Sequence, residues 1–477
     1  NFLSPLLTLW ALCVLAGCDA YSLTPGSMIE SSESRPGGAM TAKRLSTSTY
    51  ISPGRGLDKQ RQLEFWTGFS LFRDPWVIAP SSTRDRDGLG PLFNARSCIA
   101  CHKGGGRAAI AKKGVKGEDF LPLALVVRLG PLSPHSAARY PALDIKYGGQ
   151  IQPRCIARDK PDLSGEAWLN LTYQTLQGQF ADGRRYTLYK PEYRLEKLAA
   201  GPLAHGIGLS PRLAPNVFGM GLLDAIDEQD LLAQEDVDDR DGNGISAKYN
   251  RVPNVLTGER QIGRFGFKAK QPTLHQQVAA AFRDDIGITN SLFEQESCAE
   301  RQAACRQLAT QTRDSELEIP DKLLTLVTTF NRFLAVPPAR DLSKTETRAG
   351  RRLFYQLQCA VCHTPGYVTK TQGVPAAMAG QRIWPYTDLA LHDMGEGLAD
   401  GVTEFDANGR EWRTPPLWGI GLQETVSGQS HYLHDGRART IEEAILWHGG
   451  EAMKAKQGYL QLSATERQHL LQFLRAI

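Results

Sequence analysis

The chain has 477 residues, of which 41% are hydrophobic and 22% are charged, with a formal net charge of +4. This length exceeds what one compact core usually holds, so two or more domains are expected. The composition is ordinary for a globular protein, and the absence of a basic run argues against a nucleic-acid partner.

The first 18 residues predict an export signal of the lipoprotein type. Residues 2–16 are almost wholly apolar but too few to span a bilayer. They end in Leu15-Ala16-Gly17-Cys18, which resembles a bacterial lipoprotein signal with the lipid on Cys18; an ordinary cleaved signal is the alternative. Asp19 resembles an inner-membrane retention signal. We therefore expect a periplasmic protein anchored to a membrane surface, with residues 19–57, rich in Ser, Thr, Gly and Pro, as a flexible tether.

A helical pattern begins near residue 58 and leads to the motif Cys98-Ile99-Ala100-Cys101-His102. A second motif of the same CxxCH form stands at Cys359-Ala360-Val361-Cys362-His363. Two thiols at this spacing can form thioethers to both vinyl groups of one haem, and the adjacent histidine then binds the iron. A redox dithiol would need a thioredoxin-like context, and a zinc site would need a second ligand pair. We therefore predict two covalently bound c-type haems, with His102 and His363 as proximal ligands.

Two further features follow the first motif. Short apolar runs bounded by turn residues predict strands within residues 120–200. Cys298 and Cys305, seven residues apart in a polar stretch, predict a disulfide, which suits an oxidising compartment.

The acidic stretch at residues 236–250 predicts either a calcium site or a solvated turn. Asp239, Asp241 and Asn243, followed by Gly244, match the first half of an EF-hand loop. The twelfth position is Asn250 rather than a bidentate glutamate, which excludes a complete EF-hand.

Helices are predicted at residues 273–283 and 318–335, before a linker that begins at Val336. Beyond it, a helix precedes the second motif, and a final helix opens with the capping box of Ser463 and Glu466. We therefore predict a mainly α fold with two cytochrome c-like haem domains. These are residues 58–335, enlarged by loop and short-strand insertions, and residues 336–477, a class I cytochrome c-like domain.

The sixth ligand of the second haem has two candidates, Met394 and His448. His448 ends an apolar helical face that begins at Ile441, a position where a histidine is also common as a plain core residue. The pattern alone leaves the two candidates equal.

Several long segments resemble one bacterial family, the di-haem oxidoreductases, labelled "thiol oxidoreductase" and kin to the di-haem cytochrome c peroxidases. The segments, which span about residues 60–477 in the family's order, are Asp87–Pro91, Ser210–Pro215, Gly263–Gly266, Tyr386–Gly395, Gly409–Thr414, Tyr432–Thr440 and Trp447–Gly450. In the peroxidases, a His-x-Gly segment is followed fourteen residues later by the sixth ligand. Counting from His434 reaches His448, so the resemblance implies that His448 is the ligand and Met394 the alternative.

The resemblance also implies a direction of electron flow. Electrons would enter at the C-terminal haem, held by His363 and His448, and pass to the N-terminal haem, which would act on peroxide or another small oxidant. The donor would be a small redox protein or a quinol-linked partner. The kin place a glutamate as the distal acid/base, and the loosely matching position here is His275. Either His275 replaces that base, or it is a plain surface residue of a helix and the peroxidase activity is absent. A tryptophan between the haems would be Trp66 or Trp76.

The competing hypothesis is a pure electron-transfer cytochrome, in which a protein ligand masks the N-terminal iron. Candidates for that ligand are His135, His205 and His275. Thiol oxidation has weak support, because no CxxC pair remains after haem attachment.

Overall fold

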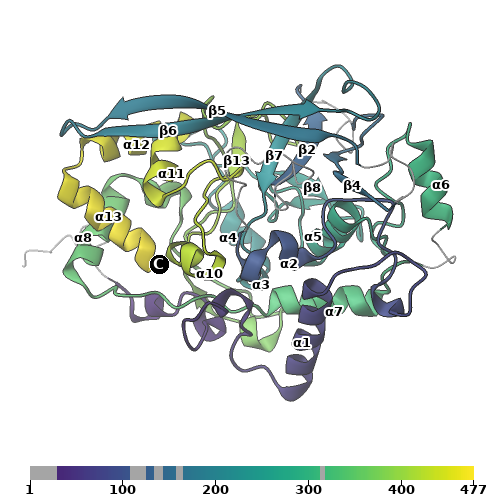
Figure 1. The fold of residues 1–477 in the computed structure, drawn as a ribbon. Helices are drawn as coiled ribbons and strands as arrows, with labels where there is room; N and C mark the ends of the chain where they lie inside the picture. Colours follow the sequence, from purple (N-terminus) through teal and green to yellow (C-terminus); the bar gives the residue numbers. More distant parts are fainter. Residues whose placement is uncertain (1–28, 108–124, 134–142, 157–164, 312–316) are drawn as a thin grey trace, which may run out of the picture.

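The computed structural model describes residues 29–107, 125–133, 143–156, 165–311 and 317–477 (Figure 1). Helices form 33% of the chain and strands form 19%, distributed over several sheets. The prediction of a mainly α fold is therefore wrong. Short strands occur in both halves of the chain, including the loops of the C-terminal half, where the sequence was interpreted only for helices. The predicted signal, Cys18 and Asp19 lie outside the described residues.

The α-helices are α1 (Lys59–Arg73), α2 (Cys98–Cys101), α3 (Met220–Asp224), α4 (Glu228–Leu232), α5 (Leu274–Ala281), α6 (Ala303–Gln311), α7 (Asp321–Arg332), α8 (Thr345–Gln356), α9 (Cys359–Cys362), α10 (Gln423–Ser427), α11 (Ile441–Trp447), α12 (Met453–Gln461) and α13 (Ala464–Ala476). Among the described helices, no helix is long and apolar enough to cross a bilayer.

The described strands pair antiparallel. The three-stranded sheet has the order β3 (Gln150–Ile151), β2 (Leu125–Pro131), β7 (Ile207–Leu213). The two-stranded sheets are β1 (Leu92–Phe93) with β4 (Arg154–Cys155), β5 (Trp168–Gln179) with β6 (Arg185–Glu196), β8 (Arg251–Pro253) with β9 (Arg260–Ile262), β10 (Tyr367–Val368) with β11 (Arg382–Ile383), and β12 (Leu391–Asp393) with β13 (Glu411–Arg413). β2, β5 and β6 are the strands expected within residues 120–200.

Each CxxCH motif follows a helix that packs against a second helix from far along the chain. α1 packs on α7, and α8 packs on α13. A glycine lies at each contact: a Cβ on Gly68 would meet the carbonyl oxygen of Leu326, and a Cβ on Gly350 would meet that of His469. The short helices α2 and α9, which carry the thiols, follow α1 and α8 respectively. Each motif thus follows one helix of a packed helix pair, within a fold that also contains several sheets.

Substitution of Gly350 by alanine is expected to destabilise the fold by roughly 1–3 kcal/mol, because the added methyl group forces α8 and α13 apart. Chemical denaturation of the purified protein measures this change. The exposed Gln356, on the same helix, provides the control, since Gln356→Ala should change stability by less than about 0.5 kcal/mol. Equal stability of the two variants would contradict close packing at the helix contact.

Residues 29–57 correct the prediction of a flexible tether over their part of residues 19–57. They contain three short 3-10 helices, and Met40 and Tyr50 are fully buried. Glu33 is 2% exposed and forms an ion pair with Arg351 of α8 at 2.9 Å. The segment folds because residues such as Met40 and Tyr50, together with this carboxylate, have partners in the core.

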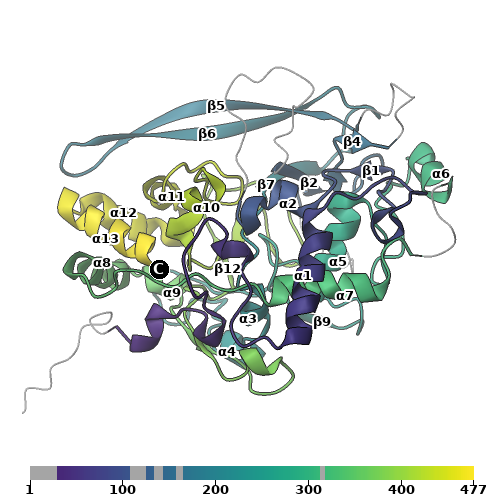
Figure 2. The same ribbon diagram turned by 60° about the horizontal axis from the view of Figure 1, so that its bottom comes forward.

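The β5–β6 hairpin precedes the second motif in sequence but lies over the C-terminal helices (Figures 1 and 2). Near its tip, Asp182 pairs with Arg467 of α13, and Arg184 pairs with Glu442 of α11. Phe180 packs edge-on against Tyr459. One hydrophobic core likewise contains residues from both sides of position 336, including Phe330 and Trp418. The predicted disulfide between Cys298 and Cys305 is formed.

Candidate functional site

The first motif forms the one-turn helix α2, and His102 follows as its C-cap. The ring Nδ1 of His102 lies 2.7 Å from the carbonyl oxygen of Pro215. Its Nε2 makes no hydrogen bond with the described residues. A backbone carbonyl that accepts from Nδ1–H fixes the tautomer in which Nε2 carries a lone pair, which is the arrangement typical of metal-bound histidines.

The second motif repeats this arrangement. His363 Nδ1 lies 3.1 Å from the carbonyl oxygen of Tyr386. His448, at the end of α11, places its Nδ1 2.7 Å from the carbonyl oxygen of Ala444. Burial, followed by the neighbouring His448 ring, lowers the pKa of His363 to about 4. These two imidazoles are therefore close together, and within the described chain neither Nε2 has a hydrogen-bond partner.

The two motifs differ in what surrounds the histidine. Burial lowers the pKa of His102 to about 4, and Arg107 is the one charged side chain among the described residues that contributes. No described imidazole acts on the pKa of His102 as His448 acts on that of His363. Of the suggested masking ligands, His205 is exposed in a turn, and His275 Nδ1 contacts Thr328 Oγ1 of α7 at 3.0 Å. His135 lies outside the described residues.

The thiols suit covalent haem attachment better than dithiol chemistry. Burial raises the pKa of Cys98, Cys101 and Cys359 to about 12, so these thiols stay protonated and are poor redox nucleophiles. Together with the histidine orientations, this donor set fits a haem at each motif.

A metal-ion interpretation exists for Cys362, Asp388 and His392, whose ligand atoms all lie within 4.8 Å of one another. However, His392 already contacts Asp388 through Nε2 and Glu451 through Nδ1, each at 2.8 Å. Burial opposes the charged form of this ring, but Asp388 and its other partners raise the His392 pKa well above the ordinary value. A protonated imidazole has no lone pair for a metal, so this cluster does not fit an ion.

A carboxylic acid that the sequence interpretation missed lies beside the first motif. Asp285 belongs to the π-helical turn η7 (Phe282–Ile286) that follows α5. Its carbonyl oxygen accepts hydrogen bonds from the N–H groups of Asn94 and Ala95, just before the motif. Its Oδ1 accepts from Gln150 Nε2 at 2.9 Å. Its charge acts on both Cys98 and Cys101, which places the carboxyl group near the two thiols.

Asp284 and Asp285 are adjacent but have opposite electrostatic environments. Asp284 forms ion pairs with Arg128 and Arg283 at 2.7 Å and with Lys270 at 3.8 Å. Burial raises the pKa of both carboxyl groups. For Asp284 the three cations outweigh burial and the pKa is lowered, whereas for Asp285 burial prevails and the pKa is raised. The surroundings thus favour the ionised form of Asp284 and the protonated form of Asp285. Neighbouring carboxyl groups with separated pKa values are typical of acid/base sites.

Aromatic side chains lie close to the second motif. Trp412 of β13 stacks on His434 at 3.8 Å and meets Phe267 edge-on at 6.5 Å. Trp412 also pairs across the sheet with His392, which contacts Cys362. By contrast, Trp66 is 48% exposed on α1, and Trp76 is buried against Phe282.

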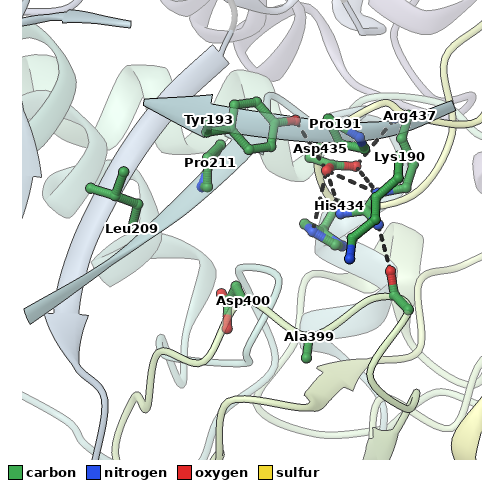
Figure 3. A pocket seen from close by; sticks show the side chains of 11 residues that line it. Lys190, Pro191, Tyr193, Leu209, Pro211, Ala399, Asp400, His434, Asp435 and Arg437 are labelled. Carbon is green, nitrogen blue, oxygen red and sulfur yellow. Dashed lines mark hydrogen bonds and ion pairs between the residues drawn. The ribbon is translucent and has the colours of Figure 1, made fainter. Parts of the chain in front are cut away.

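His434 also lines a cavity of about 190 Å³ beneath the β5–β6 hairpin (Figure 3). Asp435 on its wall is held by Arg437 at 2.7 Å and by the hydroxyl group of Tyr193 at 3.0 Å. The charged groups of this wall are therefore largely paired with one another.

The acidic loop remains a predicted calcium site. The Asp239 carboxylate accepts from Gly244 N–H, Asp241 accepts from Asn243, and the Asn243 side chain accepts from Ile245 N–H. Asn250 is fully buried and bonds to the carbonyl oxygens of Lys268 and Glu404. The loop oxygens thus cap the loop's own N–H groups, and within the described residues they do not form a group of three clustered metal-binding side chains.

Two motifs, each with a thiol pair and a histidine oriented by a backbone carbonyl, define the class of two-centre haem proteins. The chain belongs to the family described as "Di-haem oxidoreductase, putative peroxidase", which it matches over residues 145–477. This range contains the second motif, Asp285 and His448, and the family implies two haems and oxidoreductase chemistry. Comparisons with curated proteins and with solved structures found no match.

Proposed function

We propose that the protein is a di-haem c-type oxidoreductase that reduces peroxide or another small oxidant at the haem bound by Cys98, Cys101 and His102. The observation that carries this proposal is the difference between the two histidines. The neighbouring ring of His448, which would fill the sixth position of the C-terminal iron, lowers the pKa of His363, whereas no described histidine acts in this way on His102. An iron with two protein ligands only transfers electrons, while an open position permits chemistry.

The bound haems would store and transfer the electrons. Reduction of hydrogen peroxide consumes two electrons and two protons, breaks the O–O bond and yields two waters. The electrons would come singly from an external reduced partner through the C-terminal centre. The Asp285 carboxylate would accept a proton from one peroxide oxygen and return it to the departing oxygen. The hydrogen bond from Gln150 Nε2 orients this carboxyl group.

We keep the remaining expectations as part of the proposal. They are a periplasmic location with a lipid anchor at Cys18, and a small redox protein or quinol-linked donor as the partner. The disulfide between Cys298 and Cys305 supports an oxidising compartment.

The proposal is tested by absorption and EPR spectra of the ferric and half-reduced protein, each with and without hydrogen peroxide. We expect two haems, one low-spin and bis-histidine, the other high-spin at least after half-reduction and reactive with peroxide. Two low-spin haems whose spectra do not change with peroxide, in either the ferric or the half-reduced state, would instead establish the pure electron-transfer alternative. A single haem by pyridine haemochrome analysis would show that one motif does not bind haem.

A further inference from the structure

One buried and one half-buried arginine lie beside the haem motifs without a carboxylate partner among the described residues. Arg107 is 8% exposed, and its guanidinium donates only to the carbonyl oxygens of Leu433 and Leu213, at 2.6 and 3.3 Å. Arg413 is half-buried and donates only to the carbonyl oxygens of Gly266 and Thr414, at 2.9 and 3.0 Å. Neither guanidinium forms an ion pair within the part of the chain that the structure describes.

Both guanidiniums retain unused donors. Arg107 Nε is buried and has no hydrogen-bond partner. Arg413 Nη2 makes no hydrogen bond with the described residues. Carbonyl oxygens satisfy individual N–H groups but do not neutralise a buried cation. Accordingly, burial lowers the pKa of each arginine to about 10.

The nearest carboxylates are already engaged. Asp435, which acts on Arg107, is bound by Arg437 at 2.7 Å. Asp388, which acts on Arg413, is bound by His392 at 2.8 Å. Neither carboxylate is thus free to neutralise its arginine, so each guanidinium can accept a further anion.

The positions of the arginines indicate which anion this is. Arg107 follows the first motif by five residues, and its charge acts on His102. Arg413 pairs with Leu391 in the β12–β13 sheet, and Leu391 follows Asp388 by three residues. The N–H of Asp388 donates to the carbonyl oxygen of Cys362 in the second motif. The two arginines also lie on either side of Phe267: the Arg107 guanidinium is 5.9 Å from its ring, and Arg413 N–H donates to its carbonyl oxygen.

We propose that Arg107 and Arg413 are propionate-binding residues, the first for the haem of the N-terminal motif and the second for the haem of the C-terminal motif. This inference relies on haem attachment at both motifs, as proposed above. Each haem carries two carboxylates, and a guanidinium binds a carboxylate through two parallel hydrogen bonds. The pairs would fix each haem in its pocket and hold positive charge near each iron.

The test is a spectroelectrochemical titration of both haems in Arg107→Gln and Arg413→Gln, without peroxide. Removal of a nearby cation favours ferric iron, so the haem beside the altered arginine should show a ferrous-to-ferric ratio lowered about tenfold at fixed potential, a shift of about 59 mV. The other haem should change much less. Redox-difference infrared spectra should show altered propionate bands in the same variant.

Three further variants, Arg264→Gln, Arg107→Lys and Arg413→Lys, make the outcome decisive. Arg264 is also buried and bonded only to carbonyl oxygens, those of Leu223 and Ile226, so Arg264→Gln removes a matched charge. The midpoint potentials of both haems in Arg264→Gln should stay near those of the unaltered protein. Arg413→Lys retains the charge and should keep the potential close to normal, while altering the propionate bands.

Equal shifts in all three glutamine variants, or no shift in Arg107→Gln and Arg413→Gln, would overturn the inference. If the glutamine variants do not fold, the lysine variants decide. Unchanged propionate bands in Arg413→Lys would overturn the inference for the C-terminal haem, and unchanged propionate bands in Arg107→Lys would overturn it for the N-terminal haem. Because no peroxide is used, failure here is distinguishable from failure of the proposed peroxide chemistry.

Discussion

Replacement of His448 by methionine is expected to raise the midpoint potential of the C-terminal haem by on the order of a few tenths of a volt. Axial ligands set haem potentials over about 0.8 V, and a thioether favours ferrous iron more than a second imidazole does. His448 is placed for this role by its proximity to His363 and by the carbonyl oxygen of Ala444, which orients its ring. A spectroelectrochemical titration measures the change, with the haem identified by its low-spin EPR signal.

Met394 provides the control, because its backbone lies next to Gly449 and it was the other candidate ligand. Met394→Leu should leave both the potential and the low-spin spectrum unchanged. A large shift of the midpoint potential in Met394→Leu, together with no shift in His448→Met, would assign the sixth ligand to Met394 instead of His448.

Replacement of Asp285 by asparagine is expected to lower the turnover rate with hydrogen peroxide by about 10²- to 10⁴-fold, the usual contribution of a general acid/base. Asparagine preserves the size and can still accept from Gln150, but it cannot carry the proton. Haem content and both midpoint potentials should remain close to those of the unaltered protein. Stopped-flow reaction of the half-reduced protein with peroxide measures the rate.

His275→Gln tests the alternative acid/base residue with a side chain that can still contact Thr328. We expect its peroxide rate to be unchanged, since His275 packs between α5 and α7. If His275→Gln were slow and Asp285→Asn normal, the acid/base role would belong to the histidine.

The local elements of this protein were largely predictable from its sequence. Helical periodicity located α1, α5, α7 and α13, and the capping box of Ser463 and Glu466 is present as expected. Short apolar runs bounded by turn residues indicated strands within residues 120–200, where β2 to β6 are found. The predicted proportion of helix to strand was wrong because two- and three-residue strands such as β12 and β13 are defined by pairing with distant segments. Such short strands have no periodic sequence pattern of their own.

The site was predictable only where chemistry depends on fixed spacing. The CxxCH motifs can be recognised in the sequence as predicted haem sites, because the two thiols and the histidine of such a site are close together along the chain. Asp285 has no such signal: it resembles its neighbour Asp284, and only the folded chain brings it to Asn94 and Gln150. Its location in an Asp-Asp pair at the end of a helix was visible, but which of the two carboxylates would be neutralised by cations was not.

The β5–β6 hairpin makes the two halves of this protein inseparable in practice. Residues 336–477 on their own would lose the partners that Arg467, Glu442 and Tyr459 find in the hairpin, as well as Glu33 beside Arg351. The spacing of the two CxxCH motifs is consequently a property of the whole chain rather than of a hinge. A recombinant C-terminal half should therefore be a poor reference for the intact protein, and grafting either half onto a foreign cytochrome would have to carry the hairpin along.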